Sequence, residues 1–144
     1  MKKKLFQICV LLILISSFSF SRLDLSQYQR EIASLENKIQ NITGRDEMER
    51  VQKMVREFGK FASLNAPACC EWEHLVIVHT FNIFEEFVQI GLEYIRLENK
   101  NNLSNRERNR MQELQASFLI YGIALEDQMD KCRFAISTIK NKKN

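Results

Sequence analysis

Proline and glycine are scarce in this chain of 144 residues, which has one proline, Pro67, and four glycines. An all-β domain of this size needs many tight turns, and turns use glycine and proline heavily. Their scarcity therefore argues against a β architecture and favours long helices joined by few connections. The chain also lacks a Gly/Ser-rich or Pro-rich linker, so we expect a single domain after any leader segment.

A basic excess is missing outside the first few residues. The 21 Lys and Arg residues outnumber the 18 Asp and Glu residues by three, and the lysines at positions 2–4 account for the whole difference. Residues 22–144 therefore carry no formal net charge. Because nucleic-acid-binding domains carry a marked basic excess or a basic face, this balance argues against a nucleic-acid partner.

Catalytic and cofactor-binding signatures are missing as well. The sequence contains no G-x-S-x-G nucleophile motif and no G-x-x-x-x-G-K-[ST] phosphate-binding loop. We therefore expect no catalytic residues, no cofactor and no enzymatic activity.

The first 21 residues have the pattern of a secretory signal peptide. The lysines at 2–4 precede an apolar stretch at 5–15, and serines and phenylalanines follow up to Ser21. A retained anchor is the alternative, although a spanning helix needs about 20 predominantly apolar residues. We predict a signal peptide over 1–21, a helical domain over 22–144, no membrane association after cleavage, and a secreted or periplasmic location.

Apolar residues then recur every three or four positions along four segments, which is the spacing of amphipathic helices. In the first segment this spacing forms a heptad seam typical of coiled coils. Helices joined by short connections form hairpins. The expected fold is therefore all-α: an antiparallel four-helix bundle built from two helical hairpins, at about 24–42/45–64 and 71–98/105–139.

Local signals mark where three of these helices begin. Thr43, with Asp46 three residues on, is a weak relative of a capping box and predicts the start of the second helix. Pro67 disfavours helical geometry in the residue before it and separates the second helix from the third. Ser104 followed by Glu107 is a full capping box and predicts the start of the fourth helix.

The third predicted helix is apolar on two sides, which is typical of a helix that touches two neighbours. One side includes Trp72 and Val76, and the other includes Leu75 and Ile77. His79 falls on an apolar side, so it is expected to be a core histidine.

Three cysteines follow the signal segment, and in an exported protein they are expected to form disulfides. If the last two helices fold back about residue 101 or 102, residues whose numbers sum to about 202–204 face each other. This register pairs Cys70 with Cys132, with Cys69 as the alternative partner of Cys132. The left-over thiol is then buried or joins two chains in a homodimer.

Zinc is the alternative for the same residues. Cys69, Cys70, His74 and Cys132 have suitable ligand types. The spacing contains no C-x2-C pair, however, and an oxidising compartment favours the disulfide. We therefore predict no metal site and keep zinc as the alternative.

Two functions from different classes fit these features. The first is an exported, non-enzymatic interaction protein that binds a protein or another macromolecule in the envelope, at the cell surface or outside the cell. The second is a carrier of a small apolar ligand in the bundle core. The candidate ligand-binding residues for the carrier are Phe81, Phe84, Phe87 and His79.

Asn41 and Asn102 each begin an N-glycosylation sequon, which has meaning only in a host that glycosylates secreted proteins.

Overall fold

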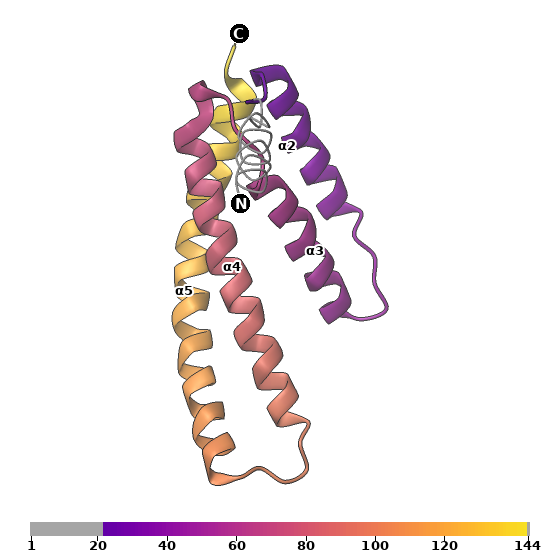
Figure 1. Ribbon diagram of the computed structural model, residues 1–144, viewed down its shortest axis with the longest axis vertical. Helices are drawn as coiled ribbons and strands as arrows, with labels where there is room; N and C mark the ends of the chain where they lie inside the picture. Colours follow the sequence, from indigo (N-terminus) through magenta and orange to yellow (C-terminus); the bar gives the residue numbers. More distant parts are fainter. Residues whose placement is uncertain (1–21, 144) are drawn as a thin grey trace, which may run out of the picture.

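The computed structural model describes residues 22–143, which fold into four α-helices and one 3₁₀ turn (Figure 1). The helices are α2 (Leu25–Gln40), α3 (Glu47–Ala62), α4 (Glu71–Glu98) and α5 (Asn105–Asn141), and the turn η1 (Ala68–Cys70) leads into α4. No strand occurs in this part of the chain, so the all-α prediction is confirmed. The predicted signal segment, residues 1–21, lies outside the described residues.

Side-chain caps begin the helices where the sequence provides them. The capping box predicted for α5 is confirmed, because Ser104 Oγ accepts from the backbone N–H of Glu107 at 3.3 Å and Glu107 Oε2 accepts from the backbone N–H of Ser104 at 2.9 Å. The prediction for α3 is wrong by three residues. Asp46, not Thr43, is its N-cap, and Asp46 Oδ1 accepts from the backbone N–H of Glu49 at 2.8 Å. An aspartate at this position caps the first turn, and its negative charge interacts favourably with the partial positive charge at the helix N-terminus.

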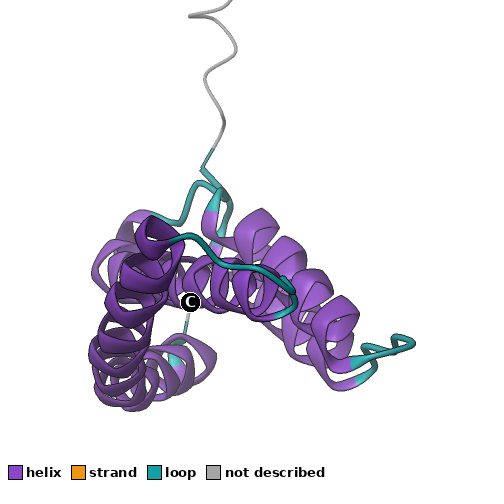
Figure 2. Ribbon diagram, turned by 90° about the horizontal axis from the view of Figure 1, so that it is seen from below, coloured by secondary structure: helices purple, strands orange, loops and turns teal. Residues whose placement is uncertain are grey.

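The four helices pack against one another, but not over equal lengths. α5 runs back along α4, whereas the shorter α2 and α3 lie against only one end of this pair (Figures 1 and 2). We call the end where α4 begins and α5 finishes the shared end. The opposite end, at the 99–104 connection, is the open end, where α4 and α5 pack only on each other.

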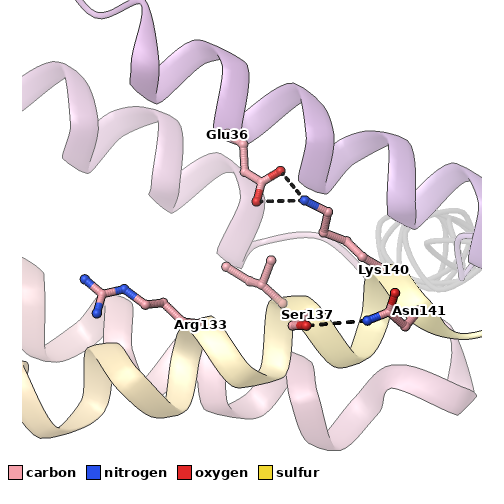
Figure 3. A pocket seen from close by; sticks show the side chains of 6 residues that line it. Glu36, Arg133, Ser137, Lys140 and Asn141 are labelled. Atoms are coloured by element: carbon pink, nitrogen blue, oxygen red, sulfur yellow. Dashed lines mark hydrogen bonds and ion pairs between the residues drawn. The ribbon is translucent and has the colours of Figure 1, made fainter.

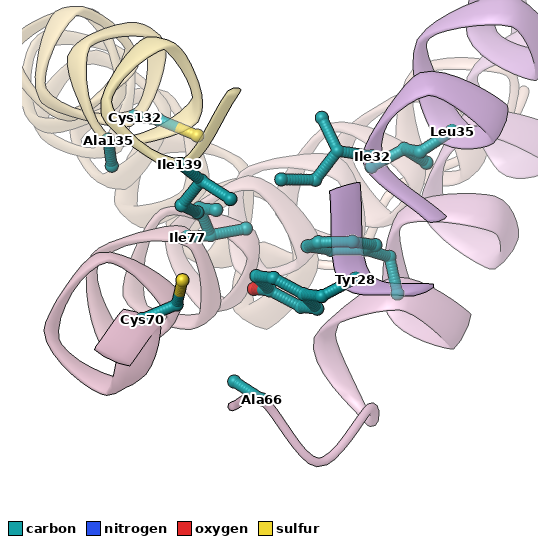
Figure 4. Close-up of a cluster of buried hydrophobic side chains, with 10 residues drawn as sticks. Tyr28, Ile32, Leu35, Ala66, Cys70, Ile77, Cys132, Ala135 and Ile139 are labelled. Atoms are coloured by element: carbon teal, nitrogen blue, oxygen red, sulfur yellow. The ribbon is translucent and has the colours of Figure 1, made fainter. Parts of the chain in front are cut away.

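The main apolar core lies at the shared end. Residues from every helix meet there, and Figure 4 shows their side chains converging between the helices. The buried members of this core are Tyr28, Ile32, Leu35, Phe61, Ala66, Cys70, Ile77, Cys132, Ala135 and Ile139. The position of this core explains why α2 and α3 lie at this end of the longer pair.

Within residues 22–143, one helical stretch, Ala68–Glu98, is long and apolar enough to cross a membrane by length and composition alone. Glu85 and Glu86 are exposed near its middle, and charged side chains are costly inside a bilayer. Because α5 packs along this stretch, we interpret its apolar residues as packing positions for neighbouring helices. Only 17% of its most apolar window is buried, so it also presents apolar side chains to its surroundings.

Candidate functional site

A buried polar pair, Tyr28 and His74, lies within the core at the shared end. Tyr28 is fully buried, and its Oη lies 2.6 Å from His74 Nδ1. Phe61 stacks on the Tyr28 ring with centroids 5.4 Å apart. The pair therefore links α2 to α4, and Phe61 adds α3 to the same contact.

Burial determines the protonation of this pair. It raises the pKa of the Tyr28 hydroxyl and lowers the pKa of His74, because an apolar environment disfavours the charged form of each group. Hydrogen bonds to the backbone of Ala62 and Leu64 partly offset the lowered pKa of His74. His74 is then neutral at neutral pH, so Nδ1 accepts a hydrogen bond from the Tyr28 hydroxyl and the ring proton lies on Nε2, which donates to the backbone. This arrangement suits a structural link between helices.

The lowered pKa of His74 predicts a stability that falls as the pH falls. Below the usual histidine pKa of 6.5 the unfolded chain takes up a proton that folded His74 resists, so the free energy of unfolding decreases by up to about 1.4 kcal/mol per pH unit. Urea unfolding at about pH 7.5 and about pH 5.5 measures this decrease, before most carboxylates titrate.

The second histidine provides the control for that measurement. The chain has only two histidines, and His79 is exposed. The variant His74→Gln is expected to lose most of the pH dependence, whereas His79→Gln keeps it. If His79→Gln removes the dependence instead, the assignment to His74 is wrong.

The three cysteines in the described chain are free thiols. Cys70 and Cys132 are buried in the same core as Tyr28, whereas Cys69 is exposed. Burial raises the pKa of the Cys132 thiol. Burial, together with a hydrogen bond between the Cys69 and Cys70 sulfurs, 3.5 Å apart, also raises the pKa of the Cys70 thiol to about 12. Both buried thiols are therefore protonated and poor nucleophiles at neutral pH.

The simple register rule for α4 and α5, in which the numbers of facing residues sum to about 202–204, is met by one contact and not by others. Arg110 pairs with Glu93 at 2.9 Å, and their numbers sum to 203. Gln115 donates to the Tyr94 hydroxyl, a sum of 209, and Thr80 Oγ1 lies 3.5 Å from the backbone oxygen of Gln128, a sum of 208. Packed helices cross at an angle, so a loop does not fix their facing positions along the whole pair. The register thus gives no support to a Cys70–Cys132 disulfide, and that pairing stays a prediction for non-reducing peptide mapping.

The alternative zinc site does not assemble in the described residues. No group of three or more His, Cys, Asp or Glu side chains among residues 22–143 is placed to hold a metal ion. His74 Nδ1 is instead engaged by the hydroxyl of Tyr28, and the Cys69 thiol is exposed. The hydrogen bond to Tyr28 occupies Nδ1, one of the two ring nitrogens through which a histidine can bind a metal.

Two of the three phenylalanines predicted to line a ligand site pack against other rings. Phe81 meets Phe58 edge to face with centroids 5.4 Å apart, and Phe87 stacks on Phe118 at 4.2 Å. Phe84 is partly buried. These contacts connect α4 to α3 in one case and to α5 in the other, so the rings hold neighbouring helices together.

Three positions on α4 differ in burial from the sequence prediction. His79 is exposed and His74 is the buried histidine. Trp72 and Leu75, predicted to be core positions, are 75% and 60% exposed. In a helix that is apolar on two sides, the spacing of apolar residues does not show which side faces a neighbour. The sequence therefore does not determine how α4 is rotated about its own axis.

Trp72 and Phe134 flank a groove of about 460 Å³ between α4 and α5. The two side chains are 75% and 76% exposed, and Val76 and Ala135 are among the residues between them. No residue of α2 or α3 lines this space, so it opens away from the other hairpin. We call it the Trp72–Phe134 groove.

The charged residues around this groove already have partners. Glu73 pairs with Lys142 at 2.8 Å, Asp130 with Arg133 at 2.9 Å, and Lys131 with Asp127 at 2.7 Å. The groove therefore offers aromatic surface without an excess of either charge.

A second groove, of about 350 Å³, lies between α2 and α5 at the shared end (Figure 3). Lys140 Nζ lies 2.9 Å and 3.2 Å from the two carboxylate oxygens of Glu36, and Ser137 Oγ accepts from Asn141 Nδ2 at 3.5 Å. Arg133 also lines this groove. The ion pair joins α5 to α2, and its exposure limits its contribution to stability.

No protein-family model matches the chain, and no curated protein or solved structure shows significant similarity to it.

Proposed function

We propose that this protein is an exported, non-enzymatic helical interaction protein that binds another protein through the Trp72–Phe134 groove. The observation that carries the proposal is the exposure of both aromatic side chains, 75% and 76%, on either side of one groove. Exposed aromatic residues gathered at one place mark interaction sites, because tryptophan is among the residues that contribute most to protein interfaces. The proposal treats the helices as an antiparallel four-helix bundle of two hairpins, secreted or periplasmic after loss of residues 1–21.

The chemistry of the groove indicates what kind of partner fits. The charged side chains at its edge are already paired, so a strongly charged partner gains little there. An open groove between two helices accepts an apolar face of a helix or an extended apolar segment. We therefore expect an apolar protein segment with one or two large anchoring side chains.

Site-specific photocrosslinking in the producing cell tests this function. A photoreactive amino acid at position 75, beside the aromatic residues, is expected to give one discrete protein adduct. The control position is Gln52, an exposed residue on α3. Phe134→Glu should remove the adduct at position 75 while leaving the helical circular dichroism unchanged, since substitution of such an exposed residue changes stability by only about 0.5 kcal/mol. Identical adducts from positions 75 and 52, or an adduct that survives Phe134→Glu, would contradict the proposal.

A carrier of a small apolar ligand is the second candidate. It is favoured by a groove of about 330 Å³ near the open end, lined by Gly91, Tyr94, Ile95, Gln115 and Phe118, next to the predicted residue Phe87. Native mass spectrometry distinguishes the two functions. A carrier retains a small apolar ligand after purification, whereas an interaction protein has the mass of its polypeptide alone.

A further inference from the structure

The middle of α5 presents large aliphatic side chains to solvent on the side away from α4. Leu119, Ile120 and Ile123 are 65%, 65% and 63% exposed. Ile123 lies four residues after Leu119 and three after Ile120, so the three side chains lie on one side of the helix. The buried residue Leu114 belongs to the opposite, α4-facing side. We call Leu119, Ile120 and Ile123 the outer face of α5.

Neither α2 nor α3 covers this outer face. Both helices lie on the other side of the α4–α5 pair, and α2 touches α5 only weakly (Figures 1 and 2). Soluble proteins rarely leave several large aliphatic residues together in solvent unless another surface covers them.

One pair of opposite charges near the outer face lies symmetrically about its first residue. Arg108 lies 11 residues before Leu119 and Asp130 lies 11 residues after it. Eleven residues are about three helical turns, so the three side chains fall on one face of α5. All three are exposed, and Arg108 has no ion-pair partner among the described residues. Asp130 pairs with Arg133 of the same chain at 2.9 Å, but an ion pair between two exposed side chains contributes little, so Asp130 can still meet a second arginine.

This symmetry indicates which partner fits. If two α5 helices pack antiparallel about a two-fold axis near Leu119, Arg108 of each chain lies opposite Asp130 of the other. The aliphatic residues meet in the middle, and an isologous interface of this kind is self-complementary. A parallel pairing would instead place Arg108 against Arg108 and Asp130 against Asp130.

We propose that a second copy of this chain covers the outer face of α5, with the two α5 helices packed antiparallel. The association is non-covalent, so it does not depend on a left-over cysteine. The three aliphatic residues at its centre do not line the Trp72–Phe134 groove, whereas Asp130 lines that groove as well. With three aliphatic residues from each chain at its centre, we expect dissociation constants of roughly 1–100 µM.

Sedimentation equilibrium of the purified protein, in the form that the cell produces and with a thiol reductant present, tests the proposal. The wild type is expected to be a dimer in reversible equilibrium with a monomer. Leu119→Glu should weaken dimerisation about tenfold or more, because it buries a charge at the centre of the interface. Leu75→Glu, at a residue 60% exposed on α4, is the matched control and should leave the equilibrium unchanged.

Charge reversal tests the antiparallel arrangement and does not depend on an apolar substitution. Arg108→Asp and Asp130→Arg should each weaken dimerisation several-fold, because each places like charges in opposition. The double variant restores both pairs and should return the dissociation constant to within about threefold of the wild type. Arg56→Asp, at an exposed residue on α3, controls for net charge.

Three results would overturn the proposal. They are a wild type that stays monomeric at every concentration, a dimer unaffected by Leu119→Glu, and a double reversal that is no better than either single variant. Circular dichroism of each variant confirms that the helices are intact, so a loss of dimer reports on the interface.

Discussion

Replacing Tyr28 by alanine is expected to lower the free energy of unfolding by about 3–5 kcal/mol, the range for large aromatic-to-alanine changes in a core. Tyr28 is fully buried, stacks on Phe61 and donates to His74. Its loss opens a cavity where α2, α3 and α4 meet and leaves a buried imidazole nitrogen without its partner. Chemical denaturation followed by circular dichroism measures the change.

The variant Tyr28→Phe separates packing from hydrogen bonding. It keeps the ring but removes the donor, so His74 Nδ1 stays buried and unsatisfied, at a cost of about 1–3 kcal/mol. Tyr94→Phe is the matched control, because the Tyr94 hydroxyl bonds Gln115 at an exposed position. If Tyr28→Phe costs no more than Tyr94→Phe, the buried hydrogen bond does not stabilise the fold.

The second large effect is expected at Ile77. This side chain is fully buried in the core shared by all four helices, and Ile77→Ala is expected to cost about 2–5 kcal/mol. Leu75 lies two residues earlier on the same helix and is 60% exposed, so Leu75→Ala should change stability by less than about 0.5 kcal/mol. Urea unfolding of the two variants measures the contrast, and equal losses would show that α4 is rotated from the orientation described.

The bounds of the longer helices could be predicted because they depend on residues close together in the sequence. The predicted helices 71–98 and 105–139 match α4 and α5 to within two residues, since Ser104, Glu107 and Pro67 mark the breaks. The first helix begins with a capping box that the sequence analysis missed. Asp24 Oδ1 accepts from the backbone N–H of Gln27, and Gln27 Oε1 accepts from that of Asp24. The D-x-x-Q pattern was the available signal.

The arrangement of the helices could not be predicted in the same way. The rotation of α4 depends on which neighbours cover it, and its two apolar sides made Trp72 and His79 resemble core residues. The Tyr28–His74 contact joins residues 46 positions apart, and no periodicity within one helix indicates such a pair. The Trp72–Phe134 groove was missed for the same reason, because it depends on the register of two helices.

The central claim is that all four helices share one core at one end of the molecule, and that α4 and α5 extend beyond it as a two-helix pair. Amide hydrogen exchange on dilute protein with a thiol reductant tests this claim most directly. The account predicts the slowest exchange around Tyr28, Ile77 and Ile139, which are buried in the shared core, and faster exchange near the 99–104 connection, where fewer side chains are buried. Uniform protection along the whole of α4 and α5, or slowest exchange at the open end, would contradict it.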